Sequence, residues 1–119
     1  MAVQQIPADL PVELVQGDEL NFALQFAGDL SDYDISAGVY NASLTNPTVL
    51  FSPGLEIDVD TETPEEGDPV TTTTVIVSFV ETQTQQLTPR LNWRWWVKWI
   101  APGNVTRTII SGQITSRAP

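Results

Sequence analysis

Two segments of this chain place a large apolar residue at every second position, which is the pattern of a β-strand with one buried face. Residues 19–27 do so with Leu20, Phe22, Leu24 and Phe26. Residues 91–100 do so with Trp93, Trp95, Val97 and Trp99. Successive side chains of a strand point to opposite faces, so each row occupies one face of its strand. We therefore predict that the two rows meet in a single interior between two layers of strands.

Shorter segments of the same kind recur about every ten residues, separated by Pro, Gly, Asn and Asp residues that favour turns. Further strands are predicted over residues 10–16, 35–40, 55–59, 71–80 and 105–115, with a short apolar run at 49–51. Gly112, inside the last of these strands, indicates a bulge or a point of close packing. A short helical turn is predicted near 81–87, and a hairpin turn at 101–104. Seven or eight strands with one helical turn predict an all-β, antiparallel β-sandwich.

The chain has 119 residues, which is the size of one domain and is enough to bury a stable core without metal or disulfide. We predict a sandwich domain over residues 10–115, an N-terminal arm at 1–9 and a C-terminal tail at 116–119. Residues 61–69 are acidic, contain two prolines and lack large apolar groups, so we expect a mobile loop there. Neither a signal peptide nor a membrane span is indicated.

Charge is divided along the chain. All fifteen acidic residues lie between Asp9 and Glu81, and all five basic residues lie between Arg90 and Arg117. No known reaction needs such a division, but opposite charges at two places on a subunit set the orientation in which partners meet. The net charge of −10 repels phosphates, so nucleic acid is not expected as a partner.

Catalytic chemistry finds little support in the sequence. The absence of cysteine and histidine excludes disulfides, Cys/His zinc sites and imidazole or thiol catalysis. Carboxylate pairs such as Asp18/Glu19 and Glu65/Glu66 are adjacent, whereas glycosidase carboxylates need a fixed separation across a cleft. The spacing Asp58-x-Asp60-x-Glu62 begins like a calcium loop, but Thr63 stands where glycine is required, so we favour a solvated acidic face. We predict a protein that is not an enzyme and has no cofactor.

The second face of the tryptophan strand carries Asn92, Arg94, Trp96 and Lys98, and Trp96 is the unusual member of this polar set. Trp and Arg are enriched at the residues that dominate binding energy, so Trp96 could anchor an interface. An aromatic platform for the neighbouring cations is an equally good interpretation. The candidate interface residues are Arg94, Trp96, Lys98 and Arg107. A tryptophan beside polar groups also suits a sugar-binding surface, an interpretation that we rank well below these two.

Several motifs in a fixed order resemble a known family. Val15-Gln-Gly-Asp18 leads into the first strand, and Gly28-Asp-Leu-Ser-Asp-Tyr33 precedes the next. Glu81-Thr-Gln-Thr-Gln-Gln-Leu87 comes before the tryptophan strand, and Ile109-Ile-Ser-Gly-Gln-Ile-Thr115 ends the pattern. Over residues 13–115 this order resembles the small β-sandwich domains of tailed-phage structural proteins, at the N-terminus of upper baseplate proteins and in tail-fibre attachment modules. This chain departs from them in its longer, more acidic segment at 60–69 and in Asp32, where the family often has glycine.

The resemblance implies an immunoglobulin-like sandwich that serves as a structural part of a virion and docks other parts without catalysis. We therefore expect a tail component, in the baseplate or at the fibre attachment, located in the virion. Its expected partners are other virion structural proteins and further copies of the chain in a symmetric assembly, with no membrane. From the chain length we expect a free-standing adaptor or cap. The alternatives are a capsid decoration (cement) protein and, from another class, a carbohydrate-binding module.

Overall fold

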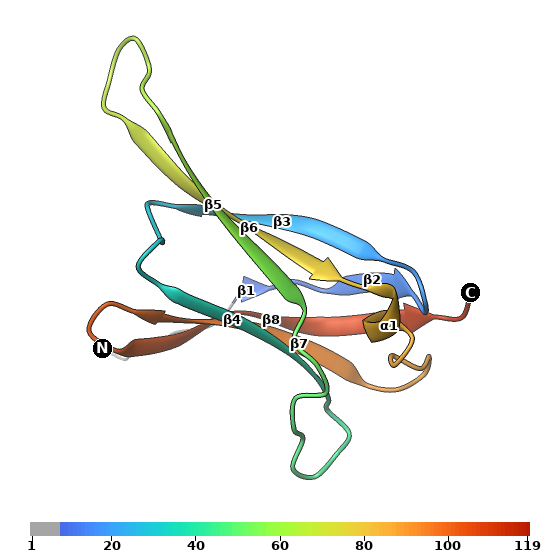
Figure 1. Ribbon diagram of the computed structural model, residues 1–119. Coiled ribbons are helices and arrows are strands. Elements are labelled where there is room, and N and C mark those ends of the chain that lie inside the picture. The colour runs from blue at the N-terminus through green and yellow to red at the C-terminus, as the bar shows by residue number, and fades with distance from the viewer. Residues whose placement is uncertain (1–7) are drawn as a thin grey trace.

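Strands dominate the computed structural model, which describes residues 8–119 (Figure 1). Its only helix in this range is one turn long. The elements in chain order are β1 (Ala8–Asp9), β2 (Val12–Val15), β3 (Leu20–Ala27), β4 (Asp34–Asn41), β5 (Gly54–Glu62), β6 (Val70–Phe79), α1 (Glu81–Thr84), β7 (Trp93–Ala101) and β8 (Val105–Arg117). Within residues 8–119, no helix is long and apolar enough to cross a membrane.

The strands form two sheets that face each other. The larger sheet has the order β1-β8-β7-β4, with β2 also paired to β8, and the smaller sheet has the order β3-β6-β5. The predicted all-β fold of two packed layers with one helical turn is confirmed. One detail differs from an antiparallel sandwich, because β1 and β2 run parallel to β8. Leu10 and Pro11 separate these two short strands, and both segments use the same edge of β8.

The core lies between the sheets and combines the two alternating rows that the sequence predicts with the inner residues of β6. Trp95, Val97, Val75, Val77 and Phe79 are fully buried there. The rings of Phe22 and Trp95 meet edge to face, with centroids 5.5 Å apart and planes at 87°. Leu20, Phe22, Leu24 and Phe26 are half-buried and pack against this core. The predicted shared interior is therefore confirmed, although β3, at the edge of its sheet, is less completely covered than β7.

Gly112 allows the first strands to reach the core. It lies opposite Trp95 in the β7–β8 pair, and a Cβ atom at this position would collide with the carbonyl group of Leu10. The Trp95 indole N–H donates a hydrogen bond to that same carbonyl oxygen at 2.9 Å. Of the two sequence interpretations of Gly112, close packing is the correct one. The bulge of β8 lies elsewhere, between the partners of Val97 and Lys98.

Two boundaries differ from the sequence prediction. Of the predicted arm 1–9, residues 1–7 lie outside the described residues, while Ala8 and Asp9 form β1. The last strand continues to Arg117, two residues into the predicted tail. This extension is stabilised by pairing with β2 and by the buried Ser116 hydroxyl, which donates a hydrogen bond of 2.6 Å to the carbonyl oxygen of Leu87.

The predicted acidic loop is shorter than expected because strands extend into it. β5 continues through Glu62 and β6 begins at Val70, so the connecting loop comprises residues 63–69. Thr61 and Thr71 pair across the hairpin, and their hydroxyl groups are 3.0 Å apart. Figure 1 shows that the end of this hairpin projects well beyond the rest of the sandwich.

We predict that Gly112→Ala lowers the free energy of unfolding by about 1–3 kcal/mol, because the added methyl group pushes Leu10 and its hydrogen bond away from Trp95. Urea denaturation followed by tryptophan fluorescence measures this change. The matched control is Gly54→Ala, where a Cβ would meet the nearest atom of Ser78 at an ordinary 3.6 Å. An equal effect of the two substitutions would contradict this role for Gly112.

Candidate functional site

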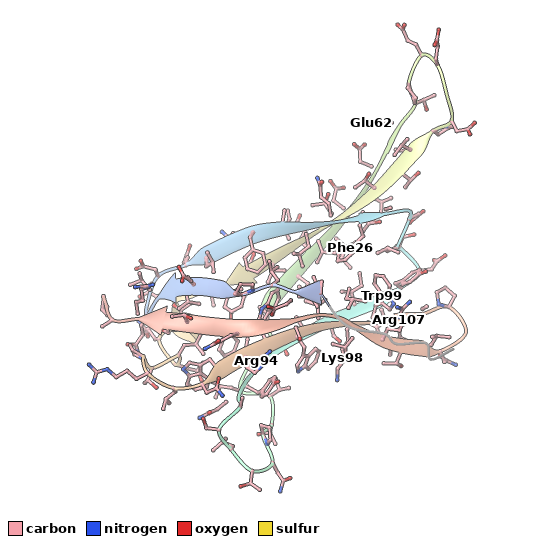
Figure 2. The ribbon with its side chains drawn as sticks, turned by 180° about the vertical axis from the view of Figure 1, so that it is seen from behind. Phe26, Glu62, Arg94, Lys98, Trp99 and Arg107 are labelled. Carbon is pink, nitrogen blue, oxygen red and sulfur yellow. The ribbon has the colours of Figure 1, made fainter. Side chains whose placement is uncertain are left out.

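Arg94, Trp96 and Lys98 project from the outer face of the larger sheet, which points away from the smaller sheet. They alternate along β7 with the buried residues Trp93, Trp95 and Val97. All three are half-buried. Figure 2 shows Arg94 and Lys98 on the side of β7 away from Phe26, a residue of the opposing sheet. The structure thus places three of the four candidate interface residues on one surface.

Trp96 is held in place by its neighbours on this face. Its cross-strand partner is Gly38, where a Cβ atom would lie 2.5 Å from Cζ2 and 2.8 Å from Cε2 of the indole ring. The missing side chain of Gly38 therefore provides the space that the ring occupies. On the ring, the Lys98 ammonium nitrogen lies 4.4 Å from the centroid, which is a cation–π contact. This contact agrees with the platform interpretation of Trp96, and the interface interpretation stays a prediction.

A shallow hollow of about 270 Å³ adjoins Trp96 and is lined by Tyr40, Pro47, Val49 and Trp96. Tyr40 pairs with Arg94 across β4 and β7, so a cation lies at its side. The other wall comes from the segment between β4 and β5, where Val49 and Leu50 remain largely exposed. Two backbone hydrogen bonds hold this segment against β4, from Val39 N to Phe51 O and from Leu50 N to Val39 O.

Sequence reasoning missed the hollow because it is made by a loop that folds back on the sheet. Pro47 and Val49 follow the strand signal of β4 and carry no periodic pattern of their own. Tyr40 could have been found, because it alternates with Val39, which the pattern places in the core. The apolar run at 49–51 is a second signal, because contiguous exposed apolar residues mark interaction surfaces.

Arg107 does not join the other candidate residues, and grouping it with them is wrong. In the β7–β8 pair it lies opposite Trp99, a residue whose ring contacts Phe26 of the other sheet. Its side chain therefore belongs to the inner face, near the end where the two hairpins separate (Figure 2). The reason is the β8 bulge, which leaves Ile109 without a partner in the register and reverses the alternation beyond it.

The outer face of the smaller sheet has the opposite charge. Along β5, the exposed outward positions are Glu56, Asp58, Asp60 and Glu62. The outward residues of β3 and β6 beside them are uncharged. Glu65, Glu66 and Asp68 continue the acidic character into the loop at the hairpin end. Among residues 8–119, no three carboxylates converge in a geometry that could hold a metal ion.

Other polar groups of the described residues serve the fold. The pKa of Asp29 is lowered because the side chain and backbone of Ser31 donate hydrogen bonds to its carboxylate, the backbone bond at 2.9 Å. These bonds shape the β3–β4 turn. Thr84 links α1 to the β2–β3 turn by accepting from Gly17 N and donating to Asp18 O. Within residues 8–119, the buried side-chain polar atoms all have hydrogen-bond partners.

No protein-family model matches this chain, and no curated protein matches it either. Its function is therefore inferred from its own residues. The most distinctive arrangement that they form is the aromatic and cationic surface made by Arg94, Trp96 and Lys98 with the hollow beside Trp96.

The two tryptophans on opposite faces of β7 should differ in what their removal does. We predict that Trp95→Ala lowers the free energy of unfolding by about 3–5 kcal/mol, because it leaves a cavity in a fully buried site. Trp96→Ala should lower it by only about 1 kcal/mol, because that ring is partly exposed and packs on Gly38 outside the core between the sheets. Chemical denaturation of both variants measures the difference. A larger loss for Trp96→Ala would contradict the assignment of the two faces.

Proposed function

We propose that this chain is a structural protein of a tailed-phage virion that acts, without catalysis, as a docking or adaptor component of the tail, in the baseplate or at the fibre attachment. The observation that carries the proposal is the outer face of the larger sheet, where Trp96 lies between Arg94 and Lys98 beside a shallow hollow. Tryptophan and arginine dominate the energy of protein interfaces when a partner covers them.

The strand order supports the immunoglobulin-like part of the proposal. In immunoglobulin sandwiches, the second, fourth and fifth strands share one sheet, and the third, sixth and seventh share the other. In this chain β3, β5 and β6 form the smaller sheet, while β4, β7 and β8 belong to the larger one. If β1 and β2 together count as the first strand, the other six strands are divided between the sheets in the same way. The first strand differs, because it pairs with the last strand here and belongs to the sheet of the second, fourth and fifth strands in that arrangement.

The charge distribution supports docking in a defined orientation. The charged residues on the outer side of β7 are cations, whereas those on the outer side of β5 and in its loop are all carboxylates. Complementary charges on two faces steer partners and suppress wrong orientations, while adding less to affinity itself. Such a division suits a subunit that is held between neighbours in an ordered assembly.

One observation favours a carbohydrate-binding module as a second candidate function. Tyr40 and Trp96 both line the hollow on the larger sheet, and exposed aromatic rings can stack on sugars. Against this stands the position of the Lys98 ammonium group, which already covers one face of the Trp96 ring. Binding on a glycan array that is lost in Trp96→Ala would favour this function over docking.

Location in the particle tests the virion proposal. Imaging of phage particles that carry a labelled copy of this chain should show a few copies at the tail end. Hundreds of copies over the head would instead identify a capsid decoration protein, and no signal on particles would contradict both. We expect Trp96→Ala to reduce incorporation several-fold while the protein remains folded, because the substitution removes an interface anchor rather than core packing.

A further inference from the structure

We propose that one copy of this chain docks on the next by placing its projecting β5–β6 hairpin end on the outer side of β7 of its neighbour, beside Arg94 and Lys98. This inference rests on the proposed structural function and names the partner as a second copy. We call residues 62–70 the hairpin tip. We call the surface formed by Tyr40, Pro47, Val49, Arg94, Trp96 and Lys98 the acceptor surface.

The hairpin tip has the composition of a docking element. All of residues 62–70 are exposed, and they include the carboxylates Glu62, Glu65, Glu66 and Asp68. They also include three apolar residues that the chain itself leaves uncovered, Pro64, Pro69 and Val70, the last with 59% of its surface exposed. The tip carries no basic residue that could neutralise its carboxylates. A partner that offers positive charge and an apolar contact would complement both features of the tip.

The acceptor surface offers both. Arg94 and Lys98 supply positive charge on either side of Trp96, and Pro47 and Val49 supply an apolar wall. Residues two apart along a strand lie about 7 Å from each other, so the backbone positions of Arg94 and Lys98 are about 13 Å apart. The hollow, at about 270 Å³, is smaller than most small-molecule sites and suits one or two side chains of a protein partner.

Within one chain the two elements lie apart. The hairpin tip belongs to the smaller sheet and the acceptor surface to the outside of the larger one. Figure 1 shows the hairpin end and the β4–β5 segment, which contributes Pro47 and Val49, projecting on opposite sides of the sandwich. Contact between them therefore joins two different patches on two copies. Such a heterologous contact repeats from copy to copy and generates a ring or a filament.

Net charge gives the association an unusual salt dependence. Two chains of charge −10 repel each other at about 0.01 M salt, where the screening length of about 30 Å exceeds the 16.4 Å radius of gyration. At about 0.1 M the screening length falls to about 10 Å, so this repulsion fades while ion pairs in direct contact persist. At about 1 M those pairs are screened as well. Self-association should therefore be strongest at intermediate salt.

Sedimentation velocity of the full chain at these three salt concentrations tests the proposal. We expect oligomers at about 0.1 M salt and fewer at the two extremes. We also expect Lys98→Glu to raise the Kd of self-association about tenfold or more. The double substitution Glu65→Lys/Glu66→Lys should have the same effect. A mixture of the Lys98→Glu variant with this double variant should associate again, because each supplies the charge that the other has lost.

Matched controls separate a specific contact from general charge effects. Arg107→Glu is the control for Lys98→Glu, because it makes the same charge change but lies on the inner face. Asp18→Lys/Glu19→Lys is the control for the hairpin variant, because it makes the same charge change near α1, at the other end of the smaller sheet. We expect both controls to associate like the unmodified chain. Controls that behave like the test variants, or a chain that is monomeric at all three salt concentrations, would overturn self-docking. Location on phage particles is measured separately, so the proposed tail function stands or falls independently.

Discussion

The contacts of Trp95 hold the three parts of this structure together. Its ring is fully buried and meets Phe22 and Phe79 of the smaller sheet edge to face. Its N–H group donates to the Leu10 carbonyl oxygen, in the link between β1 and β2. One side chain of β7 thus connects both sheets and the N-terminal strands. Buried aromatic pairs add to the large apolar area that such a residue removes from water, so the fold depends strongly on this position.

Because the inner face of β7 supplies this stability, the residues of its outer face are not needed for the core. Trp96 is adjacent to Trp95 in sequence, yet it packs on Gly38 and carries the Lys98 ammonium group on its ring. The same division exists in β5, whose inner residues Leu55 and Val59 are half-buried while its outward carboxylates are exposed. Arg94 and Lys98 on the outer side of β7 and the carboxylates on the outer side of β5 thus lie on opposite faces of the fold, while Asp9, Glu13 and Asp34 also face outward on the larger sheet.

Alternation in the sequence was sufficient to predict the layers and the residues between them, since period-two patterns depend only on strand geometry. It could not place Arg107, because one extra residue in β8, Ile109, puts the alternation before it out of step with the alternation after it, and no residue type marks this bulge. It also gave no sign that β1 and β2 pair parallel to β8, which depends on the close approach at Gly112. The hollow beside Trp96 requires a loop to fold onto β4, a long-range contact that local patterns do not encode.

Native-state hydrogen exchange of the Trp95 indole N–H tests most directly whether this residue unites the two sheets and the first strands. If it does, the N–H exchanges only through global unfolding, with the same free energy of opening as the backbone amide of buried Val77. A much lower opening free energy for the indole N–H would show that β1 and β2 detach on their own. That result would contradict the central role of Trp95 in holding the fold together.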